Sequence, residues 1–514
     1  MVPAVLARLW ARLKKLPWYR FAAGVLAGAP GLALTFAMRL GGLGVFLPEI
    51  AVDFTVGRIP GNVESFFIRT MGEGAKILAL FTSLAVFLVI PGLYAVPYRW
   101  IEKRVKNRWI AFALYGLVPA AIALFAILPL LGAGFLGSLT AAGTSGAVFS
   151  QVLSSFLFAA LLDYFLVDLA SRHPEGFSLS RRQFLAAAGI LVVGAVATLY
   201  GLGTIVARPA RLVFASVDEM FSKEETPTDE FYVVTKNLLD PPGDKVGWQL
   251  TVDGLVAVPA NYTLQNLRDR ADSAQQETAT LECVSNEVGG NLIGTARWTG
   301  VPLAALLADA QVQPGADWVA FTCVDGYTVG VPLAKALNAT SLVALDMNGF
   351  ELPPKHGGPA RIIVPGLYGM FHAKWLTKIS VVSGEVLGFW QQKGWTNRGA
   401  IRTTAIVATP PHNSVVGSAV TIGGVALAGD RGISAVQVST DGGQTWGNAT
   451  LKTPPLSGLT WVMWKFPWTP PGGGSYRIVA RAVDGGGVPQ ESTPAPPFSE
   501  GAAGYDSITL LVSG

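Results

Sequence analysis

The first part of the chain alternates between long apolar runs and short basic segments, whereas the rest shows the shorter hydrophobic periods of water-soluble domains. A transmembrane helix needs about 20 apolar residues, so each long run can cross a membrane. These runs are residues 21–38, 77–98, 109–162 and 184–207. The third has no charged residue and is long enough for two spans joined by a Gly-rich turn at 132–146. The pattern predicts an all-α transmembrane domain of about five helices over residues 21–207.

Lysine and arginine residues indicate how these spans are oriented. Basic clusters precede the first predicted span, follow the second and precede the fifth, whereas the turn at 132–146 has no positive charge. With five spans, all of these clusters fall on one side of the membrane, and basic loops stay in the cytoplasm. We expect residues 1–20 to be a cytoplasmic N-terminus. The C-terminal half is then on the periplasmic or extracellular side of the cytoplasmic membrane.

The predicted spans contain few polar side chains that could bind a cofactor or take part in a reaction. None of the four histidines of the chain lies in a predicted span, which excludes a membrane haem with two histidine ligands. Asp163 and Asp168 lie near the cytoplasmic end of the fourth span. At a helix end we expect these carboxylates to reach the membrane surface.

The hexapeptide SRRQFL (residues 180–185) directly before the fifth span has two interpretations. Its arginines are typical of ordinary positive flanks on the cytoplasmic side. The paired arginines followed by Phe-Leu also resemble a twin-arginine export signal, which here would be internal. Such a route carries folded proteins, and it would suit a domain that acquires its cofactor before export.

Beyond the spans, the pattern changes to short alternating runs. Residues 208–227 are charged, contain proline and predict a linker. FYVVTKN (231–237) is expected to begin a strand-rich region, and residues 263–270 and 302–310 have helical patterns. Mixed strands and short helices predict an α+β domain over residues 228–402.

The last part of the chain, residues 403–514, consists of short alternating runs separated by Gly, Pro and Asp-Gly turns. Strands at this spacing predict an immunoglobulin-like β-sandwich. STDGGQTW (439–446) is a hairpin signal because of its Asp-Gly-Gly centre.

Composition supports a membrane part and limits the partners. Hydrophobic residues make up 51% of the chain and charged residues only 14%, and the mean hydropathy is +0.43. The net charge is +4, and the basic residues cluster beside the apolar spans, so nucleic-acid binding is not indicated. Cys283 and Cys323 are the only two cysteines, and a disulfide between them is possible.

Candidate chemistry concentrates in two windows of the α+β domain. Cys283 follows the alternating run TATLE and enters a Ser/Asn/Gly-rich loop, which places a thiol at the end of a strand. Residues 347–378 contain His356, Arg361, His372 and Lys374, a high density for a chain with four histidines.

Several stretches occur in the order CVSN…GTARWTGVPL, DGYTVGVPL and MNG…LPP.HG.P.R..VPG.YG…KWL. Over about residues 228–395 they resemble the molybdopterin-dependent sulfite oxidase family, including its bacterial methionine sulfoxide reductase branch. The resemblance implies a molybdenum-molybdopterin cofactor with Cys283 as the metal-coordinating thiolate, since a soft ligand suits a soft, redox-active metal. Cys323 would lie near the cofactor without binding the metal, and Tyr232 and Val233 would contact the pterin.

The same resemblance assigns the second window to the pterin and its phosphate. An anionic phosphate calls for cations and backbone donors on turns. The matching positions are His356, Arg361, His372, Ala373 and Lys374.

Arg297 and Trp298 match the family segment on the substrate side, where a cation beside an aromatic wall would suit a small oxyanion. The sequence departs from sulfite-oxidising members at two points. The loop after Cys283 lacks their paired arginines, and their downstream tyrosine is replaced near Trp395. A neutral or larger substrate than sulfite is therefore favoured.

These features predict a membrane-anchored oxidoreductase that transfers an oxygen atom at molybdenum to or from a small substrate such as sulfite or a sulfoxide. The chain has no haem motif and no cluster-binding cysteines, so electrons would pass to or from a separate carrier, a cytochrome or a quinone-linked protein. The C-terminal domain resembles the family's dimerisation module and predicts a possible homodimer. Two alternatives stay open: a sulfoxide or N-oxide reductase with the same cofactor, and a cofactor-free binding module in which Cys283 pairs with Cys323.

Overall fold

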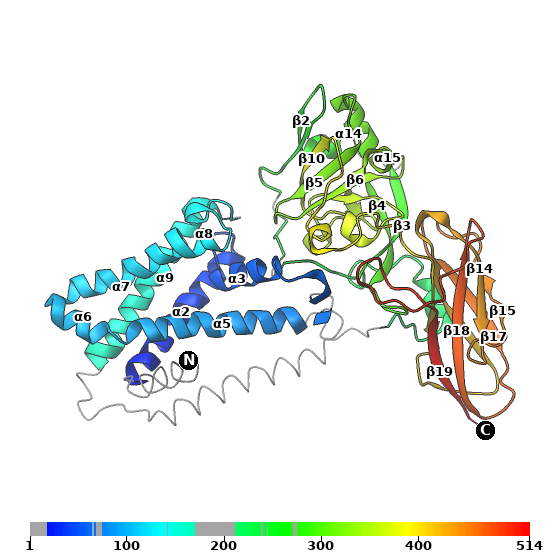
Figure 1. Cartoon of the computed structure of the whole chain (residues 1–514), viewed down its shortest axis with the longest axis horizontal. Coiled ribbons are helices and arrows are strands. Elements are labelled where there is room, and N and C mark those ends of the chain that lie inside the picture. The colour runs from blue at the N-terminus through cyan, green and yellow to red at the C-terminus, as the bar shows by residue number, and fades with distance from the viewer. Residues whose placement is uncertain are drawn as a thin grey trace, which may run out of the picture. The chain divides into compact units, whose positions relative to one another are not determined.

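The computed structural model divides the chain into two compact units (Figure 1). The first is helical, and the second contains residues 207–235 and 240–514 together with Ile59–Thr70. The described residues are 18–63, 66–67, 74–140, 142–169, 211–237, 240–243, 245–270 and 275–513. The predicted fifth span, the SRRQFL motif and most of the basic N-terminus lie outside them.

Long apolar helices make up the helical unit. They are α2 (Trp18–Leu40), α5 (Gly74–Ala95), α7 (Arg108–Ile122) and α9 (Gly143–Asp163). Among the described residues, four helices are long and apolar enough to cross a membrane. The long third run forms α7 and α9, with the chain turning between them as predicted. Asn107 caps α7 by accepting hydrogen bonds from the Trp109 and Ile110 N–H groups.

Close helix contacts and one buried ion pair hold this unit together. The α2 helix packs against α5 and α9, and Gly24 allows α2 to approach the backbone of Pro91 in α5. The prediction that Asp163 reaches the membrane surface is wrong, because the residue is buried within the helical unit and only 8% exposed. It accepts hydrogen bonds from Tyr98 and from Arg108 Nε, the latter at 2.8 Å. Because Arg108 is the first residue of α7, its guanidinium compensates the negative charge of Asp163 inside the bundle. The side chain of Asp168 lies outside the described residues.

Two short helices of the helical unit were not predicted. The α3 helix (Leu47–Val56) follows α2, and Arg39 of α2 binds Glu49 of α3 through two hydrogen bonds of 2.8 Å. The α6 helix (Tyr98–Val105) carries part of the basic cluster that follows the second span.

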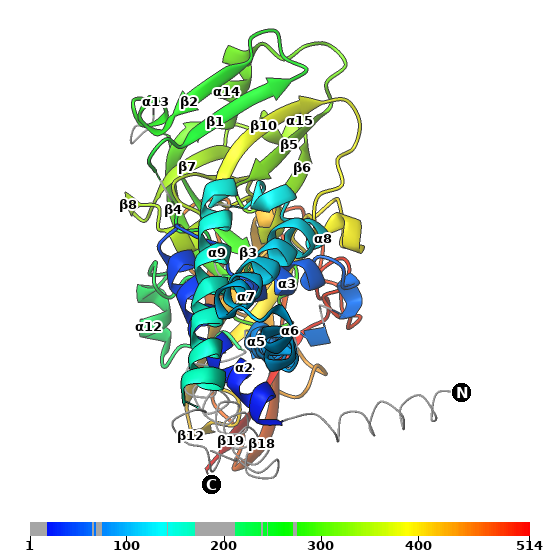
Figure 2. The same cartoon turned by 90° about the vertical axis from the view of Figure 1, so that its left-hand side faces the viewer.

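The middle domain (residues 228–402) has two sheets and short helices, which agrees with the predicted α+β class. The first sheet has the order β2-β1-β10-β5-β6 and can be followed in Figure 2. Its strands are β1 (Gln249–Gly254), β2 (Ala260–Thr263), β5 (Trp318–Cys323), β6 (Thr328–Pro332) and β10 (Leu376–Val382). The second sheet has the order β3-β4-β7-β8, with β9 paired to β7. Its strands are β3 (Gln276–Glu282), β4 (Ile293–Pro302), β7 (Leu342–Met347), β8 (Phe350–Glu351) and β9 (Arg361–Ile363).

The predicted helices are present but shorter than expected. They are α13 (Leu264–Arg268) and α14 (Leu303–Ala310), and α15 (Leu333–Ala336) was not predicted. Residues 231–237, which we expected to begin the strand-rich region, are extended but pair with neither sheet, and the first strand is β1.

The predicted linker is in fact a packed segment from Arg211 onward. Arg211 forms a 2.7 Å ion pair with the buried Asp506, and the Phe214 N–H donates to the Ala408 carbonyl at 2.9 Å. Helix α12 (Val217–Ser222) follows, capped by Ser216, and its Met220 is fully buried. Because the Leu212 N–H also donates to the Gly289 carbonyl of the middle domain at 3.1 Å, the segment joins the middle domain to the C-terminal domain.

The C-terminal domain (residues 403–514) has two sheets packed around one apolar core that includes Ile422, Trp464, Ile478 and Leu510. One sheet has the order β11-β13-β17-β16 and the other β12-β19-β18-β14-β15. The strands of the first are β11 (Thr404–Thr409), β13 (Val420–Leu427), β16 (Thr450–Leu451) and β17 (Val462–Trp468). Those of the second are β12 (Val415–Val416), β14 (Ile433–Ser439), β15 (Gly447–Asn448), β18 (Gly474–Asp484) and β19 (Asp506–Val512). The predicted hairpin joins β14 to β15.

Candidate functional site

Cys283 lies where β3 ends, as predicted, at the start of a loop that returns to β4. Its N–H donates to the Leu292 carbonyl at 2.9 Å. Asn286 closes the loop by donating to Glu282 Oε1 and accepting from the Leu292 N–H, at 2.9 and 3.0 Å. The Cys283 thiol is 8% exposed, and its sulfur lies 3.0 Å from Ser285 Oγ.

Both cysteines are free thiols, which contradicts the disulfide of the cofactor-free alternative. Burial raises the pKa of the Cys283 thiol, and it raises the pKa of the adjacent Glu282 carboxyl to about 7. A buried thiol in these surroundings stays protonated unless a cation binds the sulfur. The environment therefore suits a metal ligand better than a free nucleophile.

Cys323 ends β5 on the other sheet of the middle domain. Its N–H donates to the Tyr327 carbonyl at 3.0 Å, which closes the turn after β5. The Tyr327 hydroxyl donates to the Met370 carbonyl at 2.6 Å. Burial, together with the nearby Cys323, Asp325 and Cys283, raises the pKa of Tyr327 well above its usual value. Tyr327 therefore lies near both thiols.

Arg361, on β9, connects the two histidines of the second window. It donates to the His356 carbonyl at 2.8 Å and to the His372 carbonyl at 3.1 Å. The side chain is buried, and burial lowers its pKa to about 10. Among the described residues, the partners of its two terminal nitrogens are carbonyls rather than carboxylates, and its Nε has no hydrogen-bond partner. A buried guanidinium without a counter-charge is costly, so the arrangement suits an anionic ligand.

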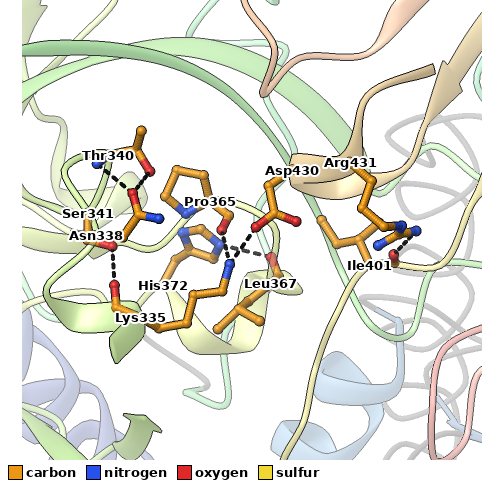
Figure 3. A network of polar contacts seen from close by, with 10 residues as sticks. All are labelled: Lys335, Asn338, Thr340, Ser341, Pro365, Leu367, His372, Ile401, Asp430 and Arg431. Atoms are coloured by element: carbon orange, nitrogen blue, oxygen red, sulfur yellow. Dashed lines mark hydrogen bonds and ion pairs between the residues drawn. The ribbon is translucent and has the colours of Figure 1, made fainter. Parts of the chain in front are cut away.

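His372 is held in its neutral form by the loop around it (Figure 3). Its Nδ1 accepts from the Val364 N–H at 3.1 Å, and its Nε2 donates to the Leu367 carbonyl at 3.0 Å. Burial and the nearby Arg361 lower its pKa to about 3. Lys335 binds the Pro365 carbonyl of the same loop and Asp430 of the C-terminal domain, at 3.2 and 2.6 Å. The C-terminal domain thus supports this side of the site.

Unpaired buried nitrogen atoms gather beside these residues. His356 donates through Nε2 to the Thr228 carbonyl at 2.7 Å, and burial lowers its pKa to about 3. Its Nδ1, Arg361 Nε and Trp298 Nε1 are buried and have no hydrogen-bond partner among the described residues. The Phe231 ring lies 5.7 Å from His356 and 5.8 Å from Trp298, and the Arg361 guanidinium lies 5.0 Å above Trp298. Arg361 Nε and Trp298 Nε1 can donate, whereas His356 Nδ1 can only accept, because its neutral ring donates through Nε2. Such a cluster fits a ligand that carries both acceptor and donor atoms, as a pterin with a phosphate does.

The extended residues 231–235 lie against the site, although they do not form a strand. A Cβ on Gly369 would stand 2.6 Å from the Tyr232 hydroxyl and 3.7 Å from Cys283 Cα, so Tyr232 lies near Cys283. Burial and the nearby Cys283 raise the pKa of Tyr232 well above its usual value. Val233 is half-buried next to it.

Lys374 and Ala373 complete the second window. Lys374 Nζ donates to the Val234 and Lys355 carbonyls at 3.3 and 3.1 Å. Ala373 is buried, and its carbonyl accepts from the Ile362 N–H at 2.8 Å. The structure thus brings most of the predicted cofactor residues into one region: Tyr232, Cys283, Cys323, His356, Arg361, His372, Ala373 and Lys374.

Arg297 and Trp298 do not form the predicted cation-and-aromatic wall. They are successive residues of β4, so their side chains point to opposite faces of the sheet. Trp298 is fully buried in the core beneath Arg361. Arg297 is partly exposed, and its Nη2 lies 3.9 Å from Glu225. Only one of the two can face a given ligand.

Sequence reasoning missed Ser285, Tyr327 and Met370. Ser285 was readable as a hydroxyl two residues after the candidate thiol, and Tyr327 as part of the Asp-Gly-Tyr turn. Met370 carried no signal, since its place depends on the short helix η5 (Gly369–Phe371).

Family models match both domains of the second unit. Residues 239–390 match an oxidoreductase molybdopterin binding domain, and residues 398–494 match a Mo-co oxidoreductase dimerisation domain. Sulfite oxidase of Gallus gallus is 32% identical over 321 residues, which cover 53% of this chain and 69% of the relative. The chain belongs to the sulfite oxidase family. It is a molybdenum-cofactor oxidoreductase, and the cofactor is molybdopterin-based.

Other similar proteins match the same part of the chain. Mitochondrial sulfite oxidase of Homo sapiens is 33% identical over 322 residues, covering 53% of this chain and 58% of that protein. The Arabidopsis thaliana sulfite oxidase is 28% identical over 323 residues, covering 52% and 82%. The solved sulfane dehydrogenase SoxCD from Paracoccus pantotrophus aligns with a TM-score of 0.45 and 24% identity, over 50% of this chain and 72% of that chain.

Proposed function

We propose that this family member is a membrane-anchored oxidoreductase in which Cys283 is the thiolate ligand of molybdenum. One observation carries the proposal: a buried free thiol lies in the same region as two buried nitrogen donors, Arg361 Nε and Trp298 Nε1, that have no partner among the described residues. When bound, the cofactor would supply a redox-active metal for oxygen-atom transfer. The alternative of a cofactor-free module is not retained.

The remaining site residues would bind and orient the cofactor. Arg361 and Lys374 supply positive charge for the phosphate, and His356 offers a buried ring nitrogen. Tyr232, Val233 and Cys323 would contact the pterin side. His372 and Ala373 would act by holding Arg361 and its strand in place, through the His372 carbonyl and the Ile362 N–H.

The substrate is proposed to be neutral or larger than sulfite. The Cys283 loop (residues 283–292) contains Glu287 and no lysine or arginine, so it offers no cation to a small oxyanion. Arg297 remains a candidate for the substrate side, and Trp298 would instead support Arg361 from below. Reduction of a sulfoxide or N-oxide is the second candidate reaction, because the thin positive charge favours it.

We further propose that the chain is a multi-pass protein of the cytoplasmic membrane, with five spans and with residues 228–514 outside. The apolar helices and their basic flanks support this arrangement. The C-terminal domain is proposed to be immunoglobulin-like and to mediate a homodimer, as the dimerisation match suggests. Electrons would be exchanged with a separate cytochrome or quinone-linked carrier.

Steady-state assays on the purified full chain test the reaction. Oxidation of sulfite and reduction of methyl sulfoxides and N-oxides would be measured with artificial one-electron carriers. We expect turnover of a sulfur or nitrogen oxide pair, and a loss of about 100-fold or more in Cys283→Ser. Molybdenum-loaded wild-type protein that turns over none of these substrates would contradict the proposed chemistry.

A further inference from the structure

The segment Ile59–Thr70 lies in the sequence between two helices of the helical unit, α3 and α5. In the structure it belongs to the same compact unit as the middle and C-terminal domains. Of its described residues, Gly61 is buried, whereas Asn62, Val63, Phe66 and Phe67 are exposed. One point of this connection is therefore packed against the middle and C-terminal domains.

Gly61 fits its place because it has no side chain. A Cβ at this position would stand 2.6 Å from the Lys393 carbonyl oxygen, 2.8 Å from the Phe498 ring and 3.2 Å from Trp395 Nε1. The first of these is a backbone atom, which cannot rotate away as a side chain can. Any other residue would have to push the connection off this surface.

The receiving surface is a junction between the middle and C-terminal domains. Trp395 and Phe498 form an edge-to-face pair with ring centres 5.1 Å apart, and the Thr396 N–H donates to the Ser499 carbonyl at 3.1 Å. Lys393 ends the short helix η6 (Gln391–Lys393). Trp395, which marks the departure from sulfite-oxidising members, is thus only 6% exposed and lies beneath Gly61.

A short chain of contacts joins this surface to the candidate site. Gln391 donates to Met370 Sδ at 3.7 Å and to the Thr396 carbonyl at 3.3 Å. Met370 accepts the Tyr327 hydroxyl through its carbonyl, and the preceding Gly369 packs beside Cys283. A well-ordered turn at 391–396 therefore helps to hold Met370 and Gly369 in place beside Cys283.

We propose that the surface formed by Lys393, Trp395 and Phe498, here called the junction surface, is a built-in docking site for the α3–α5 connection of the same chain. Seating Gly61 on it orders the turn 391–396 beside the candidate site. The described part of this connection is then more than a link between α3 and α5, because it takes part in the packing of the unit that contains the middle and C-terminal domains. The docking does not depend on the proposed reaction, whereas its effect on turnover rests on it.

Hydrogen exchange of the full chain in detergent micelles tests the docking. The amides of residues 392–396 are all hydrogen-bonded in the structure. In Gly61→Ala we expect them to exchange about tenfold faster or more, because local opening becomes easier. The matched control is Gly57→Ala, at an exposed glycine of the same connection with φ −58°, which should leave these amides unchanged. Equal exchange in Gly61→Ala and wild type would overturn the proposal.

A second variant approaches the contact from the opposite side. Phe498→Ala removes the ring under Gly61, and the Val63 amide, which donates to the Pro60 carbonyl, should then exchange faster. No change at Val63 would overturn the docking even if Gly61→Ala did not fold. If exchange changes as expected but the wild type has no turnover, the docking stands and the proposed reaction fails. If both hold, Gly61→Ala should also lower kcat relative to Gly57→Ala.

Discussion

At the residue scale, the site is defined by buried groups whose charge state the fold fixes. His372 accepts from one backbone N–H and donates to one backbone carbonyl, so a second proton would break the bond to Val364. Arg361 carries the positive charge instead, held by two carbonyls. This division leaves the buried His372 ring neutral and places the positive charge of this loop on Arg361, which can face an anionic ligand.

The first prediction concerns the stability of the fold in acid. The folded pKa of His372 is about 3, below the value of about 6.5 in an unfolded chain. The unfolded state therefore binds more protons between these values, and the contribution of neutral His372 is lost as the pH falls from about 6.5 toward 3. Replacing His372 by Gln should lower the slope of unfolding free energy against pH in this window by about 1.4 kcal/mol per pH unit. Denaturant unfolding of the two proteins at a series of pH values measures this, and identical slopes would refute it.

The residue types of the site were predictable, but the directions in which their side chains point were not. A cysteine at a strand end and the cluster of His356, Arg361 and Lys374 stand out in the sequence. The pairing of Arg297 with Trp298 failed because neighbouring residues of a strand point to opposite faces, and the sequence did not show that both lie on β4. Met370 could not be found, because its contacts come from chain segments distant in sequence.

At the element scale, the segment before the middle domain has a larger structural role than its composition indicates. Its charged, proline-containing sequence is typical of a linker, yet α12 places Met220 against β13 of the C-terminal domain. The buried Trp461 donates to the Glu224 carbonyl at 2.9 Å and fixes the end of the same segment. Short helices of this kind are stabilised by tertiary packing rather than by propensity.

The second prediction follows from this packing. Met220→Ala should lower the free energy of unfolding by about 2–5 kcal/mol, because the side chain is fully buried. Asp218→Ala, on the exposed face of the same helix, should change it by less than about 1 kcal/mol. Urea unfolding of the two variants provides the comparison, and equal losses would show that α12 does not pack as described.

Regular elements were easier to predict than irregular ones. The apolar runs and the helical patterns at 263–270 and 302–310 gave helices with shortened ends. The run 231–237 has strand-like residues but lacks a pairing partner, and partner availability is a tertiary property that local sequence does not encode.

At the scale of the whole molecule, the domains that match the family models are combined with apolar helices that lie outside the matched residues. The family models match from residue 239 onward, and the four helices of membrane type in the described part of the chain precede that position. The basic residues of α6 and the uncharged turn between α8 (Leu128–Leu130) and α9 lie at opposite ends of these helices. The positive-inside rule then assigns each end to a side.

The third prediction tests this assignment in intact cells. A cysteine introduced at Leu139, which is 77% exposed in the turn, should react with a membrane-impermeant maleimide added outside. A cysteine at Lys106, exposed at the end of α6, should react only after permeabilisation. The native cysteines are buried and provide a low background. The reverse labelling pattern would place the catalytic part in the cytoplasm.

The central claim, that the sulfur of Cys283 binds molybdenum, is tested most directly by X-ray absorption at the molybdenum edge. Full-length wild type would be compared with Cys283→Ser and with Cys323→Ser, which changes the other buried thiol. The account predicts that molybdenum loses a sulfur neighbour in Cys283→Ser and keeps its wild-type surroundings in Cys323→Ser. An unchanged sulfur shell in Cys283→Ser, or a loss in Cys323→Ser alone, would contradict it.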